Sequence, residues 1–199
     1  MPAGALRPIL ATMVASSLKN QFLIAMPGLE DPNFSRTVTY ICDHDEHGAM
    51  GIVVNRPSEL HLSDVLAHMN IDNHNPWANE QTVYLGGPVQ EERGFVLHSP
   101  RNGGWKSSIP VTDEIGITTS RDILEAMAEG RGPTRSLVAL GYAGWGAGQL
   151  EEEIQQNAWL SGPAESDILF NMPPAKRWAA AARLLGVDMA LMSTDAGHA

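Results

Sequence analysis

Short runs of apolar, β-branched and aromatic residues, separated by turn-forming residues, predict most of the strands of this chain. Such runs are typical of buried strands because these side chains pack well on a pleated surface. A polar stretch ending in Gly48 joins the second and third runs, which predicts a β-hairpin. The fourth and fifth runs are expected to form another hairpin or a neighbouring pair. The predicted strands cover residues 21–25, 37–42, 50–55, 82–85, 95–98, 114–119, 136–141 and 167–170.

Helical spacing appears in four other segments. Leu62, Val65, Leu66 and Met69 fall at positions i, i+3, i+4 and i+7, which places them on one face of a short helix. Glycine stop signals support two further helices. The predicted helices cover residues 62–69, 121–129, 149–160 and 173–185, and a glycine-rich turn is expected at 141–148.

The order of these elements favours one compact α+β domain over a doubly wound sheet, because strands come first and are then mixed irregularly with helices. We expect the domain to span residues 17–192. Residues 1–16 are expected to form a flexible extension, and residues 193–199 a flexible tail.

The charge and the cysteine content of the chain argue against some classes of protein. The chain has 13 Lys and Arg against 23 Asp and Glu, a formal net charge of −10. Direct nucleic-acid binding is therefore disfavoured, since it depends on clustered basic residues. The single cysteine, Cys42, excludes an intramolecular disulfide and fits a reducing cytoplasm. No apolar run is long enough to predict a membrane span.

Several blocks of sequence together resemble the YqgE/AlgH family of bacterial proteins. They are residues 22–29, 31–34, 40–51, 55–57, 84–89 and 141–160, within a resemblance that covers residues 17–190. The resemblance implies an α+β domain with a curved or barrel-like mixed β-sheet flanked by helices. It also implies a cytosolic protein without an established biochemical activity. One branch of the family has a name tied to alginate regulation, and the resemblance supplies no catalytic residues.

The loop of the first predicted hairpin is rich in metal-ligating side chains. Asp43, His44 and His47 are ligand types that suit zinc, manganese or iron. The two histidines lie in a loop, without the helical spacing of a zinc protease, so a solvated acidic turn is the favoured alternative. Cys42 could act as a nucleophile with His44 or His98 as its base. Its place in an apolar strand favours a buried structural role.

The glycine-rich segment at 141–148 lies between a predicted strand and a predicted helix. It lacks the full pattern of a nucleotide-binding loop, and acidic residues at the helix start would repel a phosphate. Tyr142 and Trp145, with Gly144 and Gly146 beside them, form the candidate surface for a small molecule or peptide. The alternative is that the glycines allow close backbone packing around the two aromatic rings.

These observations favour a binding or regulatory module that acts through a protein partner or a small ligand, without a cofactor. An unrecognised enzyme, with or without a metal, whose cleft gathers the hairpin loop and the glycine-rich segment around Trp145, is the first alternative. A transcriptional regulator is the second, and it would need a local basic face that the net charge hides.

Overall fold

The computed structural model describes residues 16–100 and 104–192. Except for Ser16, the predicted N-terminal extension lies outside the described residues, as does the predicted tail. The elements are β1 (Gln21–Ala25), β2 (Val38–Asp45), β3 (Gly48–Val53), β4 (Pro57–His61), α1 (Leu62–His68), a short 3-10 helix (Pro76–Asn79), β5 (Thr82–Leu85), β6 (Val89–His98), β7 (Ser108–Pro110), β8 (Gly116–Thr118), α2 (Arg121–Ala128), β9 (Ser136–Gly146), α3 (Gln149–Gln155), β10 (Trp159–Pro163), α4 (Ser166–Phe170) and α5 (Pro174–Leu184).

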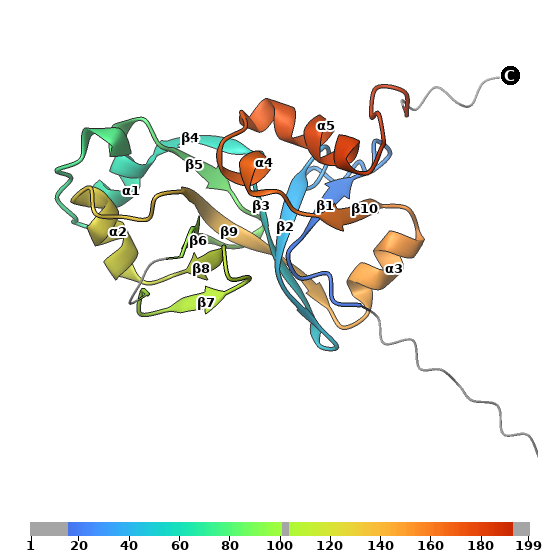
Figure 1. Ribbon diagram of the computed structural model, residues 1–199, viewed down its shortest axis with the longest axis horizontal. Coiled ribbons are helices and arrows are strands. Elements are labelled where there is room, and N and C mark those ends of the chain that lie inside the picture. Colours follow the sequence, from blue (N-terminus) through green and yellow to red (C-terminus); the bar gives the residue numbers. More distant parts are fainter. Residues whose placement is uncertain (1–15, 101–103, 193–199) are drawn as a thin grey trace, which may run out of the picture.

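One strongly curled sheet joins all the strands of the described segments, and it confirms the predicted α+β class with a curved, mixed sheet. The main strand order is β10-β1-β2-β3-β9-β6-β8-β7, and β5 pairs with both β4 and β9. The β5–β9 pair is parallel and the other pairs are antiparallel. Figure 1 shows α1 and α2 on the side of β5 and β6, and α3, α4 and α5 on the side of β1 and β10.

Strand β9 belongs to both halves of this sheet. Its second half pairs with β3, and its first half lies between β5 and β6. At the change of partner, the backbone of Gly86 and Gly87 lies directly against that of Gly141 and Tyr142. A Cβ atom on Gly86 would overlap the carbonyl oxygen of Gly141, and one on Gly87 would overlap the Tyr142 carbonyl group. The crossing therefore requires glycine.

Three apolar clusters fill the space between the sheet and the helices. The largest lies beneath α4 and α5 and contains Phe22, Tyr40 and Leu97. The second is formed by α1 and α2 against β5, β6 and β9. The third contains Trp145 and Trp159 and is closed by Leu150 of α3. Each cluster buries the apolar face of at least one predicted helix, as the helical spacing indicates.

The predicted glycine-rich turn at 141–148 is wrong, because β9 continues to Gly146. The predicted helix at 149–160 ends early: Asn157 has a left-handed φ of 57°, and Trp159 begins β10 beside β1. Asparagine tolerates this conformation and is a common helix stop.

Two other predictions are also wrong. Residues 167–170 lie in helix α4, since a short apolar run alone does not separate a buried strand from a buried helix. Strands β5 and β6 do not pair with each other, because β9 lies between them.

The crossing glycines generate a stability prediction. Gly87 has a φ of 151°, so Gly87→Ala combines backbone strain with overlap on the Tyr142 carbonyl. We expect the free energy of unfolding to fall by at least about 2 kcal/mol, measured by urea denaturation. Gly28→Ala is the matched control, because a Cβ at Gly28 contacts nothing within 4 Å. Equal midpoints for the two variants would contradict the close contact at the crossing.

Candidate functional site

A large apolar cleft lies between α1, α2 and the sheet. Its volume is about 430 Å³. Helices α1 and α2 each direct apolar side chains toward the sheet. Leu62, Leu66, Ile123 and Met127 are buried in the second cluster. Val65 and Leu124, on the neighbouring part of each helix surface, line the cleft. The apolar residues of its walls are Leu60, Val65, Met69, Val96, Leu124, Val138 and Leu140.

Acidic and neutral groups surround the opening of this cleft. Asp64 and Glu92 are exposed carboxylates, and His68 lies near them on α1. Arg121 is one cation of the rim, but its side chain is occupied. It donates from Nε to Glu125 at 2.7 Å and from Nη1 to the Met69 carbonyl at 2.7 Å. Arg93 is a second cation at this edge, where its Nη2 donates to the Thr119 hydroxyl at 3.5 Å. The carboxylates of Asp64, Glu92 and Glu125 still outnumber the two arginines, which favours neutral or cationic apolar ligands over anions.

The hydroxyl groups nearest the cleft form hydrogen bonds within the protein. The Ser120 hydroxyl at its edge donates to the Asp122 carboxylate at 2.5 Å and accepts from the Ser107 amide at 3.2 Å, so it is engaged within the protein. Thr118 is fully buried, and its hydroxyl is within 2.7 Å of His98 Nε2 and 2.5 Å of the Ser108 hydroxyl. These polar side chains are bonded to one another, which leaves the apolar walls to meet a ligand.

The sequence-predicted aromatic pair lies on a rigid strand, and its two rings face opposite sides of β9. Tyr142 packs edge-on against Phe95, with 5.6 Å between ring centres, in the largest cluster. Trp145 is 7% exposed and packs in the third cluster, 6.0 Å from Trp159. Opposite orientation follows from their odd spacing on a strand. The structure therefore does not bring Tyr142 and Trp145 together as one ligand surface.

The two glycines of that candidate site have structural neighbours. Gly144 lies beside the Tyr142 ring, since a Cβ atom there would be 3.3 Å from Tyr142 Cε2. The Gly146 amide donates to the Gln149 side chain at 3.0 Å, which connects the end of β9 to α3. The rings of Tyr142 and Trp145 are both closely packed, as in the alternative that the sequence left open.

Glu153 of α3 holds the two tryptophans in place. Its Oε2 atom accepts a hydrogen bond from Trp145 at 2.9 Å and another from Trp159 at 2.8 Å. Its Oε1 atom accepts from the Gln149 amide at 2.9 Å. Indole N–H groups need such an acceptor when they are buried. The acidic helix start, which disfavours phosphate, thus supplies a structural carboxylate.

The candidate metal ligands lie on different faces of the β2–β3 hairpin. His44 is buried: its Nδ1 accepts from the Leu18 amide at 2.8 Å, and its Nε2 donates to Glu151 at 2.7 Å. Asp43 and His47 border a shallow hollow on the exposed side, next to Trp145. In residues 16–100 and 104–192, no three His, Cys, Asp or Glu side chains form a cluster suited to a metal ion.

Cys42 has the surroundings of a core residue. It is 1% exposed, and burial raises the pKa of its thiol far above the ordinary value. Its Sγ atom contacts the Tyr40 carbonyl oxygen at 3.6 Å. His98, one of the two proposed bases, is bonded to the Ser99 carbonyl at 2.9 Å and to Thr118. A thiolate at neutral pH is disfavoured in this position.

These features define a class: a single-domain α+β protein with a curled sheet and an apolar cleft between its helices and the sheet. The AlgH-like family model matches residues 22–190, and the chain belongs to that family. It is 64% identical to a UPF0301 protein of Thioalkalivibrio sulfidiphilus, over 93% of this chain and 98% of the relative. It is 54% identical to a UPF0301 protein of Nitrosococcus oceani, over 91% and 96% of the two chains.

Solved structures show the same fold. The solution structure of AlgH from Pseudomonas aeruginosa is 48% identical, with a TM-score of 0.76 over 99% of this chain and 100% of that one. The crystal structure of protein DIP2367 from Corynebacterium diphtheriae is 21% identical, with a TM-score of 0.69 over 88% and 91% of the chains. The resemblance to the AlgH family stated from sequence blocks is confirmed.

The Glu153 arrangement predicts a specific loss of stability. In Glu153→Gln, one acceptor oxygen becomes an amino group and faces N–H donors. We expect the free energy of unfolding to fall by about 1–3 kcal/mol, with a changed tryptophan emission spectrum. Urea denaturation followed by fluorescence measures both. Glu152→Gln, an exposed change on the same helix, is the control, and an equal effect there would contradict the role of Glu153.

Buried His98 predicts a pH effect. Burial lowers its pKa below the ordinary 6.5, so the unfolded chain binds the proton more readily than the folded protein. The free energy of unfolding should therefore decrease as the pH falls below about 6.5. Urea midpoints measured across this range should vary less in His98→Gln than in the unaltered protein. His47→Gln, at an exposed site, should retain the full pH dependence; a slope unchanged by His98→Gln would contradict this assignment.

Proposed function

We propose that this protein is a binding module that takes a small, mainly apolar ligand in the cleft between α1, α2 and the sheet. The observation that carries the proposal is an open apolar cavity of about 430 Å³ in a folded, acidic domain. Pockets of this size and polarity are typical of small-molecule sites. Binding of an apolar ligand is favourable at such a surface, because the ligand removes the apolar side chains from contact with water.

The charge at the opening supports a particular class of ligand. Asp64 and Glu92 lie at the rim, and Arg121 is bonded to Glu125 and to backbone carbonyls. A fatty-acid carboxylate would meet repulsion there, whereas a neutral molecule or an organic cation would not. The ligand we propose is therefore a neutral or cationic apolar compound of drug-like size.

A regulatory role would follow from the position of the cleft. Its walls come from α1, α2 and the sheet, so a ligand would contact all three and would favour one arrangement of the helices. We propose a cytoplasmic location, which is supported by a sequence with one cysteine and therefore without an intramolecular disulfide. Among the described residues, no helix has the length and apolar character needed to cross a bilayer.

Filling the cleft should abolish this binding. Val65 lies on α1, is half-buried and faces the cavity, so Val65→Trp places an indole where the ligand would lie. We expect the affinity for the neutral dye Nile red to fall at least about tenfold, measured by fluorescence titration. The control is Leu184→Trp, which adds the same side chain at an exposed position on α5. Equal dye binding by the two variants would place the ligand elsewhere and overturn the proposal.

A further inference from the structure

A second cavity contains a buried arginine without a carboxylate partner. Arg177 of α5 is 3% exposed. Its Nε donates to the Met172 carbonyl at 2.9 Å, and its Nη1 donates to the Val54 carbonyl. No carboxylate of the described residues lies within ion-pair distance of its guanidinium group. Buried cations in proteins are normally paired, so this group lacks its usual counter-charge.

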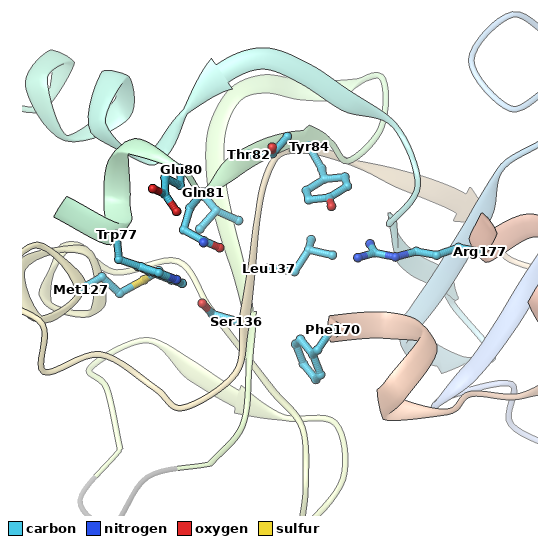
Figure 2. Close-up of a pocket in the computed structure, with 11 residues that line it drawn as sticks. Trp77, Glu80, Gln81, Thr82, Tyr84, Met127, Ser136, Leu137, Phe170 and Arg177 are labelled. Carbon is cyan, nitrogen blue, oxygen red and sulfur yellow. The ribbon is translucent and has the colours of Figure 1, made fainter. Parts of the chain in front are cut away.

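Figure 2 shows the guanidinium group of Arg177 directed into this cavity, between Tyr84 and Phe170. The guanidinium carbon lies 5.2 Å from the centre of the Tyr84 ring, which provides some compensation through the aromatic face. The two backbone hydrogen bonds occupy Nε and Nη1. The guanidinium group also forms a side-chain hydrogen bond with Tyr84, and its remaining N–H groups face the cavity.

The other walls suit a flat molecule. The volume is about 150 Å³, enough for one small ring, and the exposed lining is mainly polar. Three aromatic side chains, those of Trp77, Tyr84 and Phe170, line it together with Leu137. Ser136, Gln81 and Thr82 add polar groups along one wall. Aromatic walls with a cation at one end match a planar ring that bears an anionic group.

The electrostatic surroundings favour a single negative charge. Arg135 lies over the Phe170 ring, 5.5 Å from its centre, and forms its hydrogen bond with the Ser166 hydroxyl. It adds a second cation behind that wall. Glu80, exposed, lines the opposite side of the cavity from Arg177 (Figure 2) and opposes a dianion. A monocarboxylate therefore fits this field better than a phosphate.

We propose that this cavity is a binding site for a small aromatic or planar monocarboxylate, whose carboxylate pairs with Arg177. The ring would lie between Phe170, Tyr84 and Leu137, and its outer edge would reach Ser136. This site is separate from the apolar cleft, and it recognises a ligand of opposite charge.

A structural role for Arg177 accounts for only part of this arrangement. Its bonds to Val54 and Met172 attach α5 to the end of β3 and to the preceding loop. That attachment requires neither an open cavity at the guanidinium group nor aromatic walls around it. The test must therefore separate attachment of the helix from recognition of an anion.

Benzoate is the probe, with benzyl alcohol as its neutral counterpart and inorganic phosphate as the anion without a ring. Titration of isotope-labelled protein by NMR should show one benzoate bound per chain, with amide shifts centred on Ser136, Leu137 and Phe170. At equal ionic strength, benzyl alcohol and phosphate should each bind at least about tenfold more weakly. Equal affinity for benzyl alcohol would overturn the role of the guanidinium group, and preference for phosphate would overturn the planar ligand.

Two variants locate the site. Ser136→Phe fills the cavity but keeps Arg177, so a folding defect from lost helix attachment is avoided; it should weaken benzoate binding at least about tenfold. Arg177→Met should do the same, whereas Arg183→Met, the same change at an exposed position of α5, should leave binding unchanged. Circular dichroism verifies folding. Unaltered benzoate affinity in a folded Ser136→Phe, or shifts confined to other residues, would overturn the proposal.

The same titration distinguishes this site from the apolar cleft. Val65→Trp should abolish dye binding and retain benzoate binding, while Ser136→Phe should do the reverse. Loss of benzoate binding in Val65→Trp alone would assign the anion to the cleft and overturn the Arg177 site. Failure of dye binding in every variant would instead contradict the proposed function and leave the benzoate result standing.

Discussion

The contact between the backbone of Gly86 and Gly87 and that of Gly141 and Tyr142 is the constraint on which the rest of the fold depends. At this point β9 changes partners, from β5 and β6 to β3. Without side chains in the way, one strand can belong to both halves of the sheet, and the sheet can curl. The curl then creates the concave faces against which α1, α2 and α5 pack (Figure 1).

Aromatic residues have different roles on the two sides of β9. Near α3, Trp145 and Trp159 are fixed by one carboxylate, that of Glu153, and their N–H groups are satisfied. Near α5, Tyr84 and Phe170 border a cavity with a cation that has no carboxylate partner. Satisfied polar groups stabilise a fold, whereas a buried cation without a counter-ion favours the binding of an anionic ligand. The first group therefore stabilises the fold, and the second is the group for which we propose a binding role.

The local pattern of apolar residues predicted those helices and strands in which that pattern is regular. Helices α1, α2 and α5 were predictable from apolar spacing, and β1, β2 and β3 from their branched residues. The continuation of β9 through Gly141 was not, because that glycine is explained by a contact with residues 86–87, far away in sequence. The resemblance to a family supplied the curved sheet, which the order of elements alone did not specify.

The candidate sites were less predictable for a related reason. Val65 and Met69 carry a helical pattern that predicts a buried face, but the sequence does not show that part of this face stays open as a cleft. Arg177 lies in a helix with other charged residues, and its burial depends on where α5 packs. Conversely, Trp145 and Tyr142 were prominent in the sequence and lie on opposite faces of one strand.

The late position of β9 in the chain has a consequence for how the protein folds. Its partners β3, β5 and β6 all precede it, and β10 pairs with β1 across most of the described chain. Pairings between distant segments slow folding because large loops must close before the contacts stabilise them. During synthesis, the edges of β3, β5 and β6 that pair with β9 in the folded protein stay open until β9 has left the ribosome. The nascent chain therefore presents open strand edges, the surfaces that chaperones protect from aggregation.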